Sequence, residues 1–166
     1  MRKALLAVAA LLMLSAPALT ASAPAADMLP FVRGSWAKLR AAHRGQPIAV
    51  HFWGLTCGPC LAELPHWAQL LHERPDLNLV LIAADPVPEE PGDLSKFLGK
   101  MGLSGPESWA FADDFIDRLQ YEIDPHWHGE LPRTMLIAAD GKITTITGVS
   151  EPGEIRTWLD AQKVPR

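Results

Sequence analysis

The chain of 166 residues is 48% hydrophobic and 20% charged, with a formal net charge of −4 and a sequence pI of about 5.8. An acidic chain without a basic stripe lacks the electrostatic footprint of a nucleic-acid-binding protein, so no nucleic-acid partner is expected. The length suits one domain with its own core and is short for two.

The N-terminus has the pattern of a secretory signal peptide. Basic residues at 2–3 precede an apolar run over 4–14, and small residues follow up to Ala25. We expect cleavage after Ala25, which gives a signal peptide over 1–25 and one domain over 26–166. An uncleaved membrane anchor is the alternative, but the apolar run is about half of the roughly 20 residues that cross a bilayer. Export across the inner membrane would place the domain in the periplasm, an oxidising compartment.

Hydrophobic periodicity predicts an alternation of helices and strands in the rest of the chain. The predicted elements, in order, are a helix over 36–43, a buried strand over 47–53, a helix from Cys57 to about His72, a buried strand over 77–84, a helix near 94–102, a short strand near 109–112, a helix near 114–121, two strands within 133–148 and a helix over 152–162. Asp140 and Gly141 are a hairpin signal between the last two strands. Strands that alternate with helices and end in a hairpin predict an α/β sandwich with a mostly parallel sheet and an antiparallel edge.

The two cysteines of the chain, Cys57 and Cys60, lie in the sequence CGPC shortly after the predicted strand over 47–53. As a structural disulfide, the pair would stabilise the fold by about 2 kcal/mol, against about 4 to 5 kcal/mol for a bridge that closes a long loop. A structural zinc site normally takes four cysteine or histidine ligands, and no second cysteine pair is present. Reversible dithiol chemistry is the remaining interpretation.

The predicted helix gives the two thiols different roles. Cys57, at the helix N-terminus, faces unpaired N–H groups and the positive end of the helix dipole. These stabilise its thiolate and make it the expected nucleophile. Cys60, one turn further along, is expected to be more buried and to resolve the mixed disulfide that Cys57 forms with a partner.

Three stretches resemble a known family. FWGLTCGPC resembles the active-site turn of thioredoxins, CGPCLAELP is similar to TlpA-like thiol:disulfide oxidoreductases of the ResA/CcmG type, and GELPRTMLIAADGKI resembles the cis-proline strand and hairpin of that family. The resemblance covers about 35–162. It implies a thioredoxin-like three-layer sandwich with a mixed, mostly parallel sheet and an inserted helix and strand over 86–112. It also implies a protein-disulfide reductase with a redox-active Cys57–Cys60 disulfide and no bound cofactor.

The resemblance assigns roles to three further residues. Pro132 would lie opposite the cysteines, and a cis bond from Leu131 to Pro132 would expose backbone groups that bind an extended substrate peptide. An ordinary strand start is the alternative for Pro132. Glu63 lies three residues after Cys60, on the same helix face, where it could act as a catalytic base or proton relay. A solvated acid in the first helical turn is the alternative.

The chain departs from the family at His51 and Thr56. Thioredoxins usually carry a buried aspartate at the position of His51, and many TlpA-like proteins carry an asparagine. A histidine there is either a proton relay beneath the disulfide or a core residue with satisfied hydrogen bonds. Thr56 replaces the tryptophan that is common before the first cysteine, and Trp53 is expected to supply part of the substrate-binding aromatic surface instead.

The resemblance also implies partners. A periplasmic reductase must itself be re-reduced, which implies a membrane electron donor of the DsbD or CcdA type. The resemblance leaves the class of disulfide-bonded substrate protein open. The alternatives are apocytochrome c, a copper-site assembly protein and misoxidised proteins in general. We expect the protein to act as a monomer.

Two other functions compete with this prediction. His126 and His128 precede Pro132 in the sequence HWHGELP, and two thiolates with an imidazole would suit Cu(I) or Zn(II) in a Sco-like copper chaperone. Such chaperones typically carry CxxxC rather than CxxC, so we expect no metal site. A DsbA-like oxidase or isomerase is the third interpretation. Gly58-Pro59 disfavours it because that pair resembles the reducing thioredoxins.

Overall fold

The structure, a computed structural model, describes residues 28–85 and 91–163. The predicted signal peptide over 1–25 lies outside these residues, as does the start of the predicted insertion, 86–90. Within the described ranges, no helix combines the length and the apolar character that spanning a bilayer requires.

The described elements alternate between strands and helices, and every predicted element has a counterpart among them. In chain order they are β1 (Leu29–Phe31), α1 (Ser35–Ala42), β2 (Ile48–Trp53), α2 (Gly58–Glu73), β3 (Leu79–Ala83), α3 (Pro91–Lys100), β4 (Glu107–Phe111), α4 (Ile116–Ile123), β5 (Arg133–Ile137), β6 (Ile143–Thr147) and α5 (Pro152–Ala161). The strand β1 is an addition that sequence analysis missed.

The strands form one sheet in the order β1-β4-β3-β2-β5-β6. The pairs β1–β4, β4–β3 and β3–β2 are parallel, whereas β2–β5 and β5–β6 are antiparallel. The predicted hairpin at Asp140-Gly141 joins β5 to β6, and Gly141 has a φ of 85°, a conformation that glycine adopts without steric cost. The prediction of a mostly parallel sheet with an antiparallel edge is therefore confirmed.

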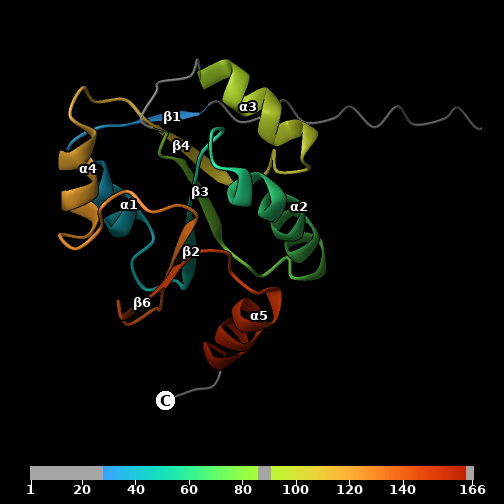
Figure 1. Ribbon diagram of the computed structural model, residues 1–166. Coiled ribbons are helices and arrows are strands. Elements are labelled where there is room, and N and C mark those ends of the chain that lie inside the picture. Colours follow the sequence, from blue (N-terminus) through green and yellow to red (C-terminus); the bar gives the residue numbers. More distant parts are fainter. Residues whose placement is uncertain (1–27, 86–90, 164–166) are drawn as a thin grey trace, which may run out of the picture.

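Helices cover both faces of the sheet (Figure 1). The helices α2, α3 and α5 contribute to one hydrophobic core, and α1 and α4 contribute to the other. The central strand β2 is buried along its whole length, as expected for a strand with a packed layer on each side. Alternate residues of β2 therefore face different cores: Ala49 and Trp53 face the α2 side, and Val50 and Phe52 face the α1 side.

The predicted insertion contains a helix and a strand, α3 and β4. The strand β4 lies between β3 and β1 in the sheet. The helix α3 buries Leu94 and Leu98 in the core that α2 shares, and its Phe97 stacks on Trp53 with ring centroids 5.8 Å apart. The insertion therefore widens the sheet and covers it beside the cysteine-bearing helix.

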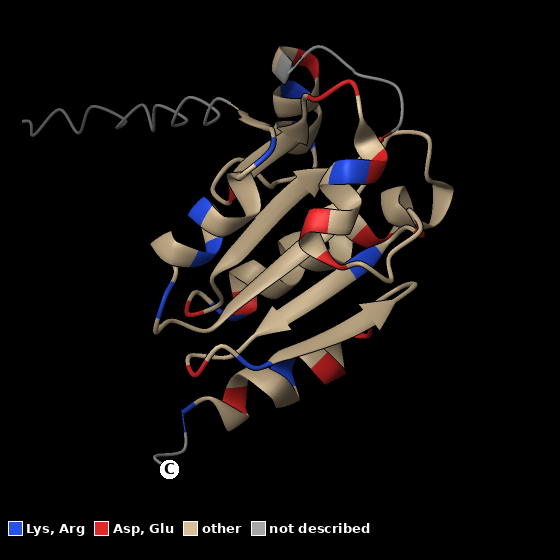
Figure 2. Ribbon diagram, turned by 90° about the vertical axis from the view of Figure 1, so that its left-hand side faces the viewer, with Lys and Arg blue, Asp and Glu red and all other residues tan. Residues whose placement is uncertain are grey.

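Charged residues lie mainly on the helices and loops (Figure 2). Both signs occur over the surface, and most of the sheet carries neither. Several opposite charges pair at the surface, for example Arg156 with Glu73 between α5 and α2. Exposed pairs of this kind contribute about 0–1 kcal/mol each, so the two buried cores supply most of the stability.

Replacing Leu81 by alanine tests the core beneath α2. Leu81 lies on the central strand β3 and is fully buried, so Leu81→Ala should lower the free energy of unfolding by about 2–5 kcal/mol. Urea denaturation measures it. Thr144→Ala, on an exposed position of β6, is the control and should change stability by less than about 0.5 kcal/mol. Equal effects of both substitutions would contradict this description of the core.

Candidate redox site

Cys57 lies at the start of α2, in the turn that follows β2. It is the N-cap of the helix, with φ −96° and ψ 96°, and its sulfur accepts a hydrogen bond of 3.2 Å from the Cys60 N–H. Pro59 occupies the first turn, where its missing N–H costs no helical hydrogen bond. A disulfide joins Cys57 to Cys60. The CGPC sequence thus forms the first turn of the helix, as predicted.

The two cysteines differ in exposure. Cys57 is partly exposed, whereas Cys60 is 0% exposed and belongs to the core under α2. A partner protein could therefore reach Cys57 but not Cys60. The helix N-terminus also favours negative charge on the Cys57 sulfur.

Asp85 holds the turn before Cys57, a role that sequence analysis missed. Its carboxylate accepts hydrogen bonds from the Leu55 N–H at 2.5 Å, the Thr56 N–H at 3.3 Å and the Thr56 hydroxyl at 2.7 Å. Gly54 permits this approach, because a Cβ there would lie 2.5 Å from Asp85 Oδ1. Asp85 directly follows the predicted strand over 77–84, and a polar residue at that sheet edge was the available signal.

Glu63 is buried on the inward face of α2, with 1% of its surface exposed. Its Oε1 accepts hydrogen bonds from Trp67 Nε1 at 3.1 Å and from the Ser150 N–H at 2.9 Å. Its Oε2 has no partner among the described residues. Burial raises the pKa of this carboxyl above its usual 4.5, against the smaller lowering effect of its hydrogen bonds. The alternative of a solvated surface acid does not fit this burial.

His51 is fully buried in β2. Its Nδ1 shares a hydrogen bond of 2.9 Å with Thr134 Oγ1 on β5, while Nε2 has no partner among the described residues. The imidazole lies 5.0 Å from the Trp67 ring of α2, centroid to centroid. Burial lowers the pKa of His51 to about 3, so the ring is neutral near pH 7.

The peptide bond from Leu131 to Pro132 is cis, as the resemblance implied. Pro132 is buried, and its carbonyl accepts a hydrogen bond of 2.8 Å from the Gly148 N–H. Leu131 is partly buried and packs against the same core as Cys57. The backbone N–H and C=O of Leu131 make no hydrogen bond within the described part of the chain. These groups are therefore free to pair with another chain.

The structure does not support the expected substrate-binding role of Trp53. Its side chain is 0% exposed and stacks on Phe97, so a partner protein cannot contact the indole. Thr56 is exposed, although its hydroxyl bonds Asp85. The surface next to Cys57 is therefore less aromatic than a tryptophan before the first cysteine would make it.

His126 and His128 lie on the exposed loop after α4. His126 Nδ1 lies 3.5 Å from Asp124 Oδ1, and the His128 N–H donates to Glu130. Over residues 28–85 and 91–163, no group of three or more His, Cys, Asp or Glu side chains is placed to hold a metal ion. The structure thus offers no specific observation in favour of the copper-chaperone alternative.

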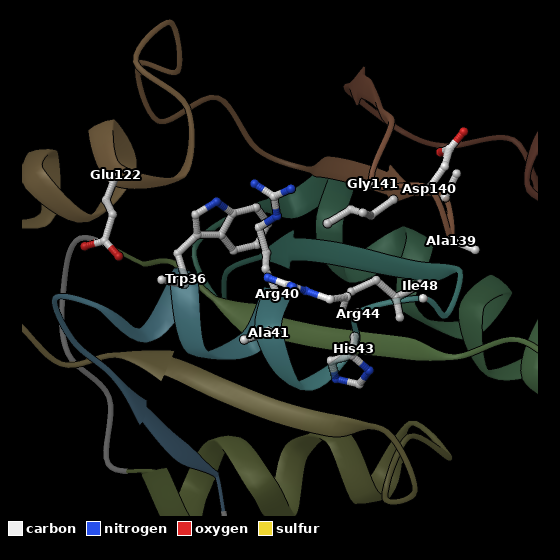
Figure 3. Close-up of a pocket in the computed structure, with 14 residues that line it drawn as sticks. Trp36, Arg40, Ala41, His43, Arg44, Ile48, Glu122, Ala139, Asp140 and Gly141 are labelled. Carbon is white, nitrogen blue, oxygen red and sulfur yellow. The ribbon is translucent and has the colours of Figure 1, made fainter.

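A cavity of about 590 Å³ lies at the other end of the sheet (Figure 3). Its lining includes Ile48 at the start of β2, Gly141 in the hairpin, and the side chains of Arg40 and Arg44. Because Cys57 follows the opposite end of β2, this cavity is not part of the redox site.

Solved structures identify the class of fold. A secreted disulfide oxidoreductase of Mycobacterium tuberculosis, homologous to E. coli DsbE, matches with a TM-score of 0.57 and 24% identity over 73% of this chain and 85% of that chain. StoA from Bacillus subtilis matches with a TM-score of 0.55 and 24% identity over 70% and 84% of the two chains. At these identities the likeness shows the fold, which is thioredoxin-like. No family model matches the chain.

Sequence similarity indicates which thioredoxin-like proteins this chain resembles. The chain is 30% identical over 122 residues, 73% of its length, to the thiol-disulfide oxidoreductase ResA of Geobacillus thermodenitrificans (strain NG80-2). It is 25% identical over 121 residues to ResA of Bacillus subtilis (strain 168). The chain is thus similar to the ResA-type thiol-disulfide oxidoreductases, which confirms the predicted resemblance. The matched stretch spans 66% of the Geobacillus relative, just under two thirds of its length.

Asp85→Asn tests the hydrogen bonds by which the Asp85 carboxylate holds the turn before Cys57. An amide in place of the carboxylate removes one acceptor oxygen and leaves a buried N–H unpaired, so unfolding free energy should fall by about 1–3 kcal/mol. Urea denaturation of the oxidised protein measures it. Asp93→Asn is the matched control, since Asp93 is exposed and, among the described residues, pairs with Lys96 at the surface. An unchanged midpoint of urea denaturation for Asp85→Asn would show that these hydrogen bonds do not stabilise the turn.

Glu63→Gln should flatten the dependence of stability on pH. Because the pKa of Glu63 is raised in the folded state, its contribution to stability is fully present below the unfolded value of 4.5 and is lost as pH rises through the folded value. Glutamine cannot ionise, so the variant should gain stability relative to the wild type over this window. Urea denaturation from about pH 4 to about pH 8 measures the difference. Parallel curves for the two proteins would contradict the raised pKa.

Proposed function

We propose that the protein is an exported thiol:disulfide oxidoreductase that reduces disulfide bonds of periplasmic proteins through Cys57 and Cys60. The observation that carries the proposal is the difference between the two sulfurs, one partly exposed at a helix N-terminus and one fully buried. Similarity to relatives that are named thiol-disulfide oxidoreductases supports the same activity.

The proposed reaction consists of two exchanges at sulfur. The Cys57 thiolate attacks a substrate disulfide, forms a mixed disulfide and releases one substrate thiolate. The Cys60 thiolate then attacks the Cys57 sulfur, which forms the Cys57–Cys60 disulfide and releases the second substrate thiolate. Two electrons pass from the protein to the substrate, and the released thiolates take up protons.

Three further residues assist this chemistry in the proposal. Glu63 accepts the proton that Cys60 must lose before it can attack, which makes it a catalytic base on the same helix face. Leu131 and Pro132 bind the substrate backbone, and the unpaired N–H and C=O of Leu131 support this role.

The direction of electron flow requires a reductant. The protein must be re-reduced after each turnover, and we propose a membrane donor of the DsbD or CcdA type. The proposed location is the periplasm, supported by the signal-like residues 1–25 and by the description of one matched structure as secreted. The substrates we propose are disulfide-bonded proteins such as an apocytochrome c or a copper-site assembly protein, and the protein acts as a monomer.

Trapping with single-cysteine variants tests the proposed function. Cys60→Ser removes the resolving thiol, so Cys57 should stay linked to its partner as a long-lived mixed disulfide. Cys57→Ser should trap little, because the remaining sulfur is buried and lies off the helix terminus. Non-reducing gels of periplasmic extract, followed by mass spectrometry of the trapped species, would identify the substrate class.

Two results would overturn the proposal. Equal trapping by the two variants would remove the assignment of attacking and resolving cysteines. If neither variant trapped a partner and the wild-type pair stayed oxidised in vivo, Cys57 and Cys60 would be a structural disulfide.

A further inference from the structure

The cavity at the end of β2 opposite Cys57 has the size of a small-molecule binding site. Its volume of about 590 Å³ lies within the range of roughly 300–1,000 Å³ that such sites occupy. The start of β2 and the end of β5 give it an apolar floor, where Ile48 and Ile137 are register partners. Trp36 of α1 also lines the cavity. A ligand bound there would therefore cover apolar surface.

Two arginines line the same cavity. Arg40 lies in the last turn of α1, and Arg44 follows shortly after the end of that helix. Both are exposed, and both extend into the cavity (Figure 3). The C-terminus of a helix favours positive charge, which stabilises the two arginines at this place. Two like charges at a spacing of four residues nevertheless repel each other, so an anion between them would be stabilising.

The two arginines differ from the others in having no partner. Within residues 28–85 and 91–163, no ion pair involves Arg40 or Arg44. Each guanidinium carries five N–H donors in a planar fork that matches a carboxylate or a phosphate. The other described arginines each pair with a carboxylate or lie over an aromatic ring, namely Arg33, Arg74, Arg118, Arg133 and Arg156.

The remaining charged groups of the lining are already bonded within the protein. Glu122 accepts the Gly34 N–H at 3.0 Å with each oxygen, at the start of α1. Asp140 accepts the Lys142 N–H at 3.1 Å within the hairpin. His43 bonds other side chains through both ring nitrogens. The acids therefore hold N–H groups while the two arginines hold no acid, and the unused bonding capacity of the cavity is that of a donor.

We propose that this cavity binds a small organic anion. Arg40 and Arg44 hold its carboxylate or phosphate group through charge-assisted hydrogen bonds, and its apolar body packs on Trp36, Ile48 and Ile137. The anion offsets the repulsion between the two guanidiniums, and the apolar body displaces water from the floor of the cavity. This binding is separate from the proposed redox function, because the cavity and Cys57 lie at opposite ends of β2.

Nitrogen-15 NMR of the oxidised protein tests the site. Naphthalene-2-carboxylate and 2-naphthyl phosphate are the probes, and at least one should cause saturable shift changes at the backbone amides of α1 and of residues 138–142. Neutral 2-naphthamide has the same apolar body without the charge, and it should bind about tenfold more weakly. The proposal would be overturned if neither anion caused saturable changes up to about 10 mM, or if the changes lay elsewhere in the chain.

Two comparisons decide what the cavity recognises. Inorganic phosphate lacks the apolar body, so it should bind about tenfold more weakly than 2-naphthyl phosphate. Equal binding of these two would show that the apolar floor contributes nothing, and an organic ligand would be wrong. Equal binding of 2-naphthamide and naphthalene-2-carboxylate would show that the arginines contribute nothing, and an anionic ligand would be wrong.

Substitution of the arginines tests their role. Arg40→Gln and Arg44→Gln should each weaken binding of the tighter probe by about tenfold. Lys38→Gln is the matched control, because Lys38 is an exposed residue of α1 outside the cavity lining. It should change the affinity by less than about twofold, since exposed charges at a distance are screened. Equal weakening by all three variants would indicate a general attraction of anions and would overturn the site.

A substitution that fills the cavity tests the location independently of charge. Ala41 is exposed and lines the cavity, so the indole of Ala41→Trp should occupy the space and abolish binding while both arginines remain. Ala42→Trp, at the next exposed position and outside the lining, is the control and should leave binding intact. Unchanged affinity in Ala41→Trp would show that the anion binds elsewhere, and the proposed site would be wrong.

Discussion

The Asp85 carboxylate fixes the turn on which the redox site depends. It accepts three hydrogen bonds from Leu55 and Thr56, just beyond the point where β2 and β3 separate. The ladder between these strands extends to the bond from the Ala84 N–H to the Trp53 carbonyl at 2.8 Å. The turn is therefore held by backbone pairing on one side and by a carboxylate on the other. This arrangement places Cys57 at the first turn of α2 and directs Cys60 into the core.

The core under this helix carries polar groups that a purely structural core would avoid. Glu63 Oε2 and His51 Nε2 are buried without partners in the described structure, and each such group costs about 1–3 kcal/mol. Apolar residues of similar size would be more stable there. The proposed role of Glu63 as the base for Cys60 would explain why a carboxyl is buried there.

Sequence patterns were sufficient for most of the fold and for the two cysteines. Periodicity located the central strands because β2 and β3 are buried along their lengths, and CGPC marked the helix start. The cis bond at Pro132 came from the family resemblance, since most bonds before proline are trans. The strand β1 was missed because it has three residues, of which only Phe31 is buried, too few for a period.

The contacts that complete the site were beyond the sequence. Asp85 is 30 residues from Leu55, and Ser150 is 87 residues from Glu63, so no local pattern links the members of either pair. The burial of Trp53 was also not predictable, because it depends on Phe97 from the inserted helix α3. Tertiary packing decided whether that aromatic residue faces solvent or the core.

The central claim is that the fold makes Cys57 the reactive thiol and Cys60 the protected one. Limited alkylation of the reduced wild-type protein with iodoacetamide, quantified for each cysteine by mass spectrometry, tests this without any partner. The account predicts that Cys57 is modified first at every pH where the protein is folded, and that Cys60 reacts only after unfolding. Modification of Cys60 at the same rate as Cys57, or before it, would contradict the account.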